Sequence, residues 1–312
     1  MKVLVTGGAG FIGSNLVKEL LLDQGTDVRV LDNLSTGSLS NLEGVLTKID
    51  FIKGSVTDIN TVNNACLGID VIFHLAAKIS VEESINNPVL TNTVNVGGTL
   101  NILSAAKDNN VKKIIFSSSA AVYGCVEAIP VKETDVINPE SPYAVQKYFG
   151  EKYCEYFSKH HGISTVCLRY FNVYGPYQQE SSGYAGVIYK FIKNAILNKA
   201  TTIEGDGKQT RDFVFVKDIV NANILAYKSL KKFSGNIYNI GTGKETTVLE
   251  LYNTIKQISG NKASVTHSEK RVGDIYRSCA NIDLSKTHLG YSPTTSLKEG
   301  LGQTIVWVKN QI

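Results

Sequence analysis

The stretch from residue 141 to residue 157, SPYAVQKYFGEKYCEYF, places a tyrosine and a lysine at a spacing that can move protons. Ser141 is a suitable N-cap and proline is tolerated in a first helical turn, so a helix is expected to begin at Pro142. Tyr143 and Lys147 then share one face of that helix. A free phenol, with a pKa near ~10, is a poor base at neutral pH, and a neighbouring ammonium favours its ionised form. The pair alone proves little, because a solvated helix face is the commoner reason for such a spacing.

Four glycines follow the first predicted strand and open the first predicted helix, at Gly7, Gly8, Gly10 and Gly13. The early glycines permit a tight turn and a close approach of backbone to a pyrophosphate, and the last lets the helix pack on the strand. The helix N-terminus adds a partial positive charge. Glycine turns also close ordinary loops, but the order of strand, turn and helix favours a dinucleotide site.

Asp32 ends the second predicted strand, where such sites place an acidic residue. A carboxylate there accepts hydrogen bonds from ribose hydroxyls and repels a 2′-phosphate, which favours NAD over NADP. The same aspartate would form the turn in LDNLSTG whatever else it does. Asp58, after the third predicted strand, is expected at the adenine end.

Strands and helices alternate through the first half of the chain, which predicts an α/β fold with a doubly wound, parallel Rossmann sheet. The strands are apolar throughout, as expected when helices cover both faces. After Phe171 loop-rich stretches appear between helical segments near 185–198, 218–230, 247–258 and 296–309. We expect an NAD-binding domain of residues 1–172 with a return segment at about 213–240. Residues 173–212 and 241–312 are expected to form a smaller, mixed α/β substrate-binding lobe. The predicted strands are residues 2–6, 27–32, 50–54, 70–76, 112–118 and 164–171.

The composition is that of a globular protein, with 312 residues, 43% of them hydrophobic, 19% charged, and a net charge of +4. No basic run points to nucleic acid, and no apolar run is long enough for a membrane span or a signal peptide. A cytoplasmic protein is therefore expected. Neither a metal site nor a disulfide is expected, because the cysteines are dispersed and contain no C-x-x-C pair. They are expected to be reduced, buried thiols: Cys66, Cys125, Cys154, Cys167 and Cys279.

These motifs together resemble the extended short-chain dehydrogenase/reductases. The glycine turn, the serines at residues 117–119 and the pair Tyr143…Lys147 carry that resemblance. The later motifs RYFNVYGP, GDGKQTRDFVFVKD and RVGD are similar to those of nucleotide-sugar 4-epimerases of the UDP-glucose 4-epimerase type. The resemblance covers essentially the whole chain. It implies tightly bound NAD, a UDP-sugar substrate, and a homodimer that uses helices near 90–108 and 143–160.

The resemblance also assigns site residues by position. The implied catalytic residues are Ser119, Tyr143 and Lys147. The implied cofactor-binding residues are Gly7, Gly10, Phe11, Ile12, Gly13, Asp32, Asn33, Ser35, Gly37, Asp58, Ile59, Leu75, Ala76, Ala77, Asn95, Ser117, Tyr143, Lys147, Tyr170 and Phe171. The implied substrate-binding residues are Val81, Ser119, Tyr143, Asn172, Gly186, Val187, Ile203, Arg211, Arg271, Asp274 and Ser278.

The chemistry expected of these residues is a reversible oxidation at carbon 4 of the sugar. Tyr143, made acidic by the Lys147 ammonium and a positively charged nicotinamide, would take the hydroxyl proton, while Ser119 binds the reacting oxygen. The 4-keto sugar must then turn over in the pocket while UDP stays anchored. Guanidinium groups at Arg211 and Arg271 suit a diphosphate, although surface ion pairs with the aspartates beside them would also explain these arginines.

Related reactions are weighed against this one. The family's dehydratases and decarboxylases carry an acidic residue shortly after the catalytic hydroxyl, whereas this chain has Ala120 and Ala121, with no carboxylate before Glu127. An epimerase is therefore preferred. The alternatives are another NDP-sugar enzyme (a UDP-glucuronate epimerase, a dehydratase or a decarboxylase) and a non-catalytic NAD-binding module. Such a module would be expected to have lost Ser119, Tyr143 or Lys147.

The preferred sugar is expected to depend on Ser278. In this family the equivalent position faces the carbon-2 substituent, where a tyrosine leaves room for a hydroxyl alone and a small residue admits an acetamido group. We therefore predict UDP-GlcNAc and UDP-GalNAc, with UDP-glucose and UDP-galactose left open. Glu204 stands where the family often stacks an aromatic ring on uracil, so Val187 or Tyr189 is expected to contact the uridine instead.

Overall fold

The computed structural model describes residues 1–126, 128–178, 186–269 and 275–312. Three residues considered above, Glu127, Arg271 and Asp274, lie outside these ranges.

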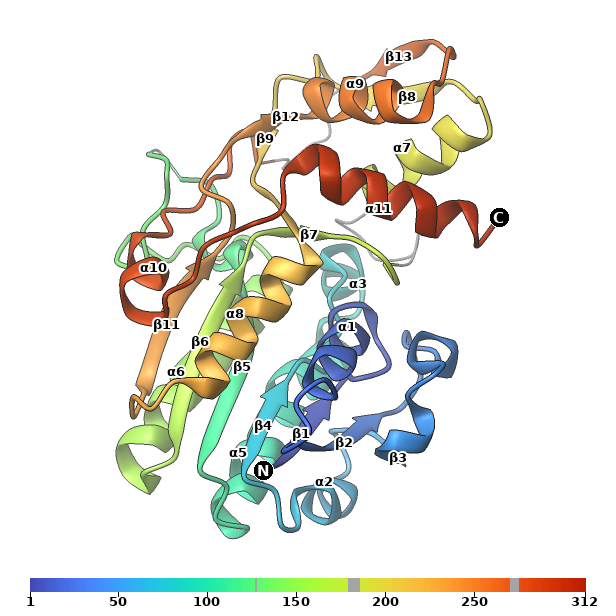
Figure 1. Cartoon of the computed structure of the whole chain (residues 1–312). Helices are drawn as coiled ribbons and strands as arrows, with labels where there is room; N and C mark the ends of the chain where they lie inside the picture. Colours follow the sequence, from blue (N-terminus) through green and yellow to red (C-terminus); the bar gives the residue numbers. More distant parts are fainter. Residues whose placement is uncertain (127, 179–185, 270–274) are drawn as a thin grey trace.

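In the described part of the chain, seven strands form one parallel sheet in the order β11-β6-β5-β4-β1-β2-β3 (Figure 1). This confirms the doubly wound α/β fold. The strand order reverses between β1 and β4, which is where such sheets bind ligands beyond the carboxyl ends of their strands. The strands are β1 (Lys2–Thr6), β2 (Asp27–Asp32), β3 (Ile49–Lys53), β4 (Val71–His74), β5 (Lys113–Ser119), β6 (Ser164–Tyr170) and β11 (Ser234–Ile240).

Helices cover both faces of this sheet, so successive strand residues enter two separate cores. Val3 and Val5 of β1 pack beneath α1 (Phe11–Leu20), α8 (Val216–Lys228) and α10 (Asp283–Leu289). Leu4, between them, packs on the opposite side with α2 (Ile59–Cys66), α5 (Gly98–Asp108) and α6 (Pro142–His161). The two-residue period of a strand explains this division, and it explains why the strands show no polar alternation.

Helix α6 begins and ends as the sequence predicts. The Ser141 side chain accepts a hydrogen bond from the Ala144 backbone N–H, and Pro142 occupies the first turn. Gly162 ends the helix with a φ of 73°, a left-handed conformation that glycine adopts at little cost. The first turn of α6 therefore has a defined start, from which Tyr143 points toward the sheet.

The C-terminal lobe has its own core, formed by α7 (Gly186–Ile196), α9 (Val248–Ser259) and α11 (Leu297–Lys309). Short strand pairs lie within this lobe and between it and the sheet domain (Figure 1). These helices match the helical segments predicted there within two residues at each end. The pairs are β7 (Asn172–Tyr174) with β10 (Phe213–Phe215), β8 (Thr201–Glu204) with β13 (Val265–Ser268), and β9 (Thr210–Arg211) with β12 (Thr246–Thr247).

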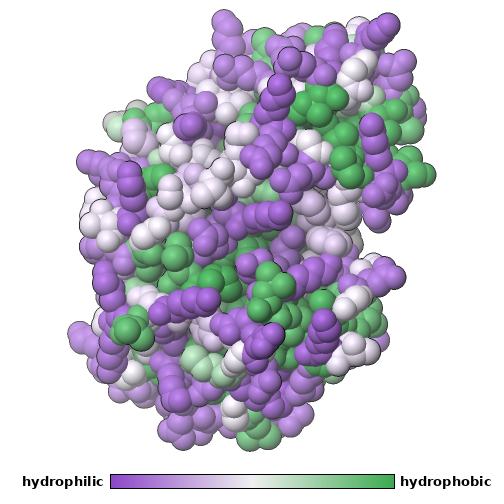
Figure 2. All heavy atoms as spheres, viewed as in Figure 1, coloured by the Kyte–Doolittle hydropathy of each residue, from purple (hydrophilic) through white to green (hydrophobic). Residues whose placement is uncertain are grey.

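Hydrophilic side chains cover much of the face in Figure 2, with hydrophobic side chains gathered around α7 and α11 and across the middle of this face. No helix in the described ranges is both long and apolar enough to span a bilayer. The expectation of five buried thiols is wrong in one case. Cys66, Cys154, Cys167 and Cys279 are buried, but Cys125 is exposed, because it follows the turn at Gly124 and lies outside the strands and helices.

Candidate active site

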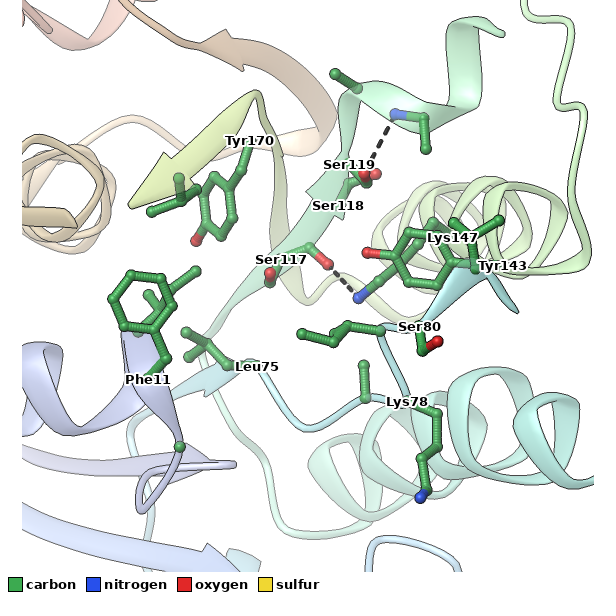
Figure 3. A pocket seen from close by; sticks show the side chains of 18 of the residues that line it. Phe11, Leu75, Lys78, Ser80, Ser117, Ser118, Ser119, Tyr143, Lys147 and Tyr170 are labelled. Carbon is green, nitrogen blue, oxygen red and sulfur yellow. Dashed lines mark hydrogen bonds between the residues drawn. The ribbon is translucent and has the colours of Figure 1, made fainter. Parts of the chain in front are cut away.

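A cavity of about 600 Å³ lies beyond the carboxyl ends of the strands, between the sheet and the C-terminal lobe. Its lining runs from the glycine turn after β1 to Ser278 in the lobe. The close-up in Figure 3 shows side chains converging on it from both helices and strand ends. The sheet's reversal point and the expected site therefore coincide.

The glycine turn has no room for side chains. Gly7 adopts a φ of +69°, and a Cβ there would lie 2.8 Å from the Ala76 backbone nitrogen. A Cβ on Gly13 would lie 2.1 Å from the Gly7 carbonyl oxygen. Helix α1 starts after Gly10 without a capping side chain and without an acidic residue in its first turn. Its N-terminus therefore presents backbone N–H groups and a partial positive charge to the cavity, which suits the pyrophosphate of NAD.

Asp32 is buried at the end of β2 and lines the cavity. Its carboxylate accepts hydrogen bonds from the Ala9 N–H at 2.9 Å and the Leu34 N–H at 2.7 Å. Burial raises the pKa of this carboxyl, while the two backbone hydrogen bonds oppose that rise. Asp32 is thus held in place beside the glycine turn, where an adenosine ribose would be bound.

Tyr143, Lys147 and Ser119 meet at the carboxyl end of β5. The Lys147 Nζ donates to the Ser117 carbonyl oxygen at 2.8 Å and lies 5.9 Å from the centroid of the Tyr143 ring. The Ser119 side chain is close enough to the Tyr143 phenol to act on its pKa, and Ser119 Oγ accepts a hydrogen bond from the Ala121 N–H at 3.2 Å. Figure 3 shows both α6 side chains reaching toward this strand end.

Burial dominates the electrostatics of this group. It raises the pKa of Tyr143 to about 12, against the opposing influence of the Ser119 side chain. It also lowers the pKa of Lys147 to about 8, against the negative charge of Glu151. The sequence predicts an acidified phenol, but the protein's own groups do not produce one, because desolvation of the ring dominates its pKa.

His74 is a structural residue of this region. Its Nδ1 lies 2.8 Å from the Thr6 hydroxyl and its Nε2 lies 3.0 Å from the Thr99 hydroxyl. Burial, together with the nearby charge of Lys147, lowers its pKa to about 3. The neutral imidazole therefore ties the ends of β1 and β4 to α5 and does not serve as a base near neutral pH.

The expected substrate residues Val81, Asn172, Val187, Arg211 and Ser278 all line the cavity. Arg211 is nearly buried and donates through Nη1 to the Thr210 carbonyl oxygen at 2.8 Å.

The aspartate beside Arg211 holds the loop that carries Ser278. The Asp212 carboxylate accepts hydrogen bonds from the N–H groups of Thr242, Gly243 and Ala280, at 2.7, 2.9 and 3.1 Å. It is buried, and its pKa is raised for that reason. Asp212 therefore joins the two segments of the lobe that face the cavity.

Most of the expected cofactor residues line the cavity as well. They are Gly7, Gly10, Phe11, Ile12, Gly13, Asp32, Asn33, Ser35, Leu75, Ala76, Ala77, Ser117, Tyr143, Lys147, Tyr170 and Phe171.

Other expected residues lie outside the lining. Asp58 caps α2 by accepting a hydrogen bond from the Asn60 N–H at 3.0 Å, beside the exposed Ile59. Gly37 packs on the backbone of Ala9. Asn95 holds the backbone of Lys78 through two hydrogen bonds of 2.7 and 2.9 Å, so it supports the lining from behind.

In the lobe, Ile203 is buried in the core and Gly186 begins α7. Glu204 is exposed, as expected. Of the two residues expected to contact uridine, Val187 lines the cavity and Tyr189 does not.

Sequence reasoning missed several lining residues, among them two carboxylates. Glu83 forms an ion pair with Lys78 at 3.1 Å, and Glu140 accepts from the Cys125 N–H at 3.2 Å. No motif marks either carboxylate, although Lys78 follows HLAA and Glu140 precedes Ser141. Tyr177 also lines the cavity, in a left-handed conformation with a φ of 71°. No sequence signal marks a left-handed tyrosine.

Comparisons with known proteins agree with this geometry. The family model described as the NAD dependent epimerase/dehydratase family matches residues 3–241. The UDP-glucose 4-epimerase of Mycolicibacterium smegmatis is 38% identical over 315 residues, which cover 100% of this chain and 99% of that protein.

Two solved structures are similar over the same extent. The UDP-N-acetylglucosamine 4-epimerase of Methanobrevibacter ruminantium, in complex with UDP-N-acetylmuramic acid, has a TM-score of 0.94 at 39% identity and covers 100% of this chain and 99% of its own. The UDP-glucose 4-epimerase of Thermus thermophilus, in complex with NAD, has a TM-score of 0.91 at 35% identity and covers 100% of both chains. This chain therefore belongs to the NAD dependent epimerase/dehydratase family, as an NAD-using enzyme of its UDP-sugar epimerases.

Proposed function

We propose that the protein inverts the configuration at carbon 4 of a UDP-hexose through a transient 4-keto sugar. The observation that carries this proposal is the meeting of Tyr143, Ser119 and Lys147 at the cavity, on the same strand end as the cofactor residues. A proton acceptor, a hydroxyl hydrogen bond and a cation are the groups that can remove the hydroxyl proton when a secondary alcohol is oxidised.

Tyr143 acts as the general base for the carbon-4 hydroxyl, and Ser119 binds the oxygen from which the proton leaves. Because burial sets the pKa of Tyr143 to about 12, the phenolate needs more positive charge than Lys147 supplies. When bound, NAD supplies the hydride acceptor and donor for carbon 4 and a positively charged ring that favours this phenolate. The glycine turn, Asp32 and Lys147 hold that cofactor.

The 4-keto sugar is kept in the cavity because the UDP group to which it is attached stays bound to the protein. Arg211 reaches the cavity from β9, and a guanidinium suits a diphosphate because it forms paired hydrogen bonds. Asn172 and Val187 complete this side of the cavity. The sugar itself must be held loosely enough to present its other face.

UDP-GlcNAc and UDP-GalNAc are the proposed substrates, with UDP-glucose and UDP-galactose also accepted. Ser278 lines the cavity with a small side chain, and Ala120 and Ala121 follow Ser119 at the same end. The relative from M. ruminantium, which is named for UDP-N-acetylglucosamine, supports the acetylated pair. UDP-glucuronate epimerisation, dehydration and decarboxylation are the alternatives. Of these, dehydration and decarboxylation act at carbon 5, where Glu83 or Glu140 of the cavity lining could take part.

The protein is proposed to work as a homodimer in the cytoplasm. Apolar side chains are exposed along α3 (Val81–Asn86), α4 (Pro88–Asn92) and α6, including Val89 at 80% and Phe149 at 49% exposure. The buried thiols suit a reducing compartment. The division into an NAD-binding domain and a substrate lobe is proposed at the boundaries given above, with β11 returning to the sheet beside β6.

Incubation with each UDP-hexose, without added cofactor, tests the proposal. We expect the carbon-4 epimer to form without net NADH, since the hydride returns to the sugar and the cofactor stays bound. The relative rates decide the sugar. Loss of carbon dioxide or water from the substrate would replace the proposal with a decarboxylase or a dehydratase.

A further inference from the structure

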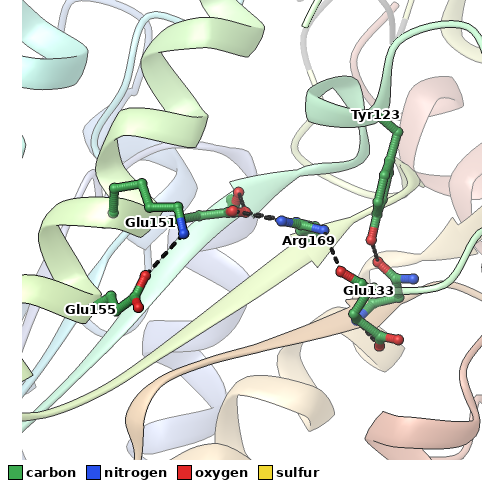
Figure 4. Close-up of polar contacts among 8 residues, drawn as sticks. Tyr123, Glu133, Glu151, Glu155 and Arg169 are labelled. Atoms are coloured by element: carbon green, nitrogen blue, oxygen red, sulfur yellow. Dashed lines mark hydrogen bonds and ion pairs between the residues drawn. The ribbon is translucent and has the colours of Figure 1, made fainter. Parts of the chain in front are cut away.

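A buried ion pair lies directly behind the active site. Glu151 of α6 is 1% exposed, and its Oε1 accepts from Arg169 Nε at 2.8 Å and from the Ser118 hydroxyl at 2.6 Å (Figure 4). Its Oε2 accepts from Arg169 Nη2 at 2.7 Å. The pair is therefore bidentate, with a third hydrogen bond from the strand that carries Ser119.

The opposite side of Arg169 is also held. Its guanidinium carbon lies 4.6 Å from the centroid of the Tyr123 ring, whose hydroxyl donates to Asn239 Oδ1 at 2.7 Å. Burying a charged pair costs several kcal/mol of desolvation, so such a pair is often no more stabilising than hydrophobic residues of the same volume. Stability alone gives little reason for its presence here.

The pair acts on the proton-transfer group by two routes, through Ser118 and through the charge of Glu151. Ser118 stands between Ser117, whose carbonyl binds Lys147, and Ser119, which lies close to Tyr143. Glu151 also follows Lys147 by four residues, one turn along the same helix face. Among the charges that act on Lys147, Glu151 is the largest that favours the ammonium.

We propose that Glu151, locked by Arg169, is a positioning residue for the reaction: it keeps Lys147 a cation and anchors the strand end that aligns Ser117 and Ser119. The inference rests on the proposed role of Tyr143 as the base. Neither Glu151 nor Arg169 lines the cavity, so both act through the residues in front of them.

Other titratable groups face the same residues and must be considered in a pH experiment. His74 of β4 faces Lys147 and stays neutral, since burial and the charge of Lys147 lower its pKa to about 3. The neighbouring Cys154 thiol and, after it, burial raise the pKa of the Cys167 thiol. The groups around Lys147 are Tyr143, Glu151 and Cys154 on α6 and His74 on β4. The groups around Glu151 are Arg169 and Cys167 on β6, Lys147 and Lys152 on α6, and Ser118 on β5.

The decisive variant replaces both charges with apolar groups, Glu151→Leu together with Arg169→Met, in the full-length enzyme. Removing the anion that faces Lys147 makes its ammonium less favourable. We expect the alkaline limb of the kcat/KM profile to move down by about one pH unit. At pH 8.5 we expect about a tenfold loss of kcat/KM, with thermal stability and bound NAD unchanged. A folded double variant with the wild-type pH profile would overturn the proposal.

Two further variants separate charge from anchoring. Ser118→Ala keeps the ion pair and should lower kcat severalfold without moving the pH limb. If kcat of Ser118→Ala is unchanged, Glu151 does not anchor the strand end. If, in addition, the double variant fails to fold, the whole proposal is overturned. The exposed pair Lys152–Glu155 on the same helix, with a 3.0 Å contact, provides the matched control. Replacing both residues with glutamine should leave the profile unmoved.

The failure of this inference can be told from the failure of the proposed function. If Tyr143→Phe retains activity, Tyr143 is not the general base, and both the proposed function of Tyr143 and the positioning role that rests on it are refuted. If Tyr143→Phe is inactive while the double variant has the wild-type profile, only the positioning role of Glu151 is lost.

Discussion

The two halves of the cavity differ in what lines them: backbone groups line one half, and side chains line the other. In the half proposed to bind the cofactor, the ends of β1, β2, β4 and β5 present backbone groups, and the glycine turn leaves no room for a Cβ. In the half proposed to bind the substrate, side chains come from short strands and loops of the lobe, such as Arg211 and Ser278. A site shaped by backbone tolerates few residue types, whereas a site shaped by side chains can change its ligand one residue at a time.

The first prediction concerns the group that joins both halves. Tyr143→Phe removes the proton acceptor but keeps the ring, so kcat should fall by about 10³-fold or more while NAD remains bound. Turnover assays and the NAD content of the purified variant measure the two effects. Retained turnover would refute the assignment of Tyr143 as base.

The second prediction tests the backbone half. In Gly13→Val, the new side chain collides with the Gly7 carbonyl, so NAD binding should be lost and the free energy of unfolding should fall by about 3 kcal/mol. Calorimetry and denaturant unfolding measure these changes. Gly302→Ala in α11 is the control, since a Cβ there meets nothing within 4 Å, and it should leave NAD binding intact.

The third prediction concerns the carboxylate beside the glycine turn. Asp32→Ala removes the acceptor for the ribose hydroxyls and leaves the Ala9 and Leu34 N–H groups without it. We expect the Kd for NAD to rise by about 10-fold to 100-fold, and the preference over NADP to shrink because a repulsive charge is gone. Equal weakening for both cofactors would contradict the role given to Asp32.

The fourth prediction tests the side-chain half and has the smallest expected effect. Ser278→Tyr should lower kcat/KM for UDP-GlcNAc and UDP-GalNAc about 10-fold relative to UDP-glucose and UDP-galactose, by filling the space of the acetamido group. Thermal stability should not change. Equal losses for all four sugars would show that Ser278 does not face carbon 2.

The elements around the cofactor could be predicted because their signals are local. The sequence predicts the bounds of the strand at 27–32 and the start of the helix at Pro142 without error. Both signals are local, because strand composition and an N-cap serine act over a few positions. The fourth strand ends at His74, earlier than expected, because Leu75 and Ala76 leave the sheet to line the cavity. The carboxylates Glu83 and Glu140 were missed because they reach the cavity through folding and not through a motif.

By itself, the sequence determined the order of strands and helices, the glycine turn, and the pairing of Tyr143 with Lys147 on one helix face, since all depend on residues close along the chain. The tertiary structure alone decided that burial would raise the pKa of Tyr143, that Arg169 would meet Glu151 behind it, and that Cys125 would be exposed. Desolvation and ion pairing depend on what surrounds a side chain from every direction, and most of those neighbours are distant in sequence.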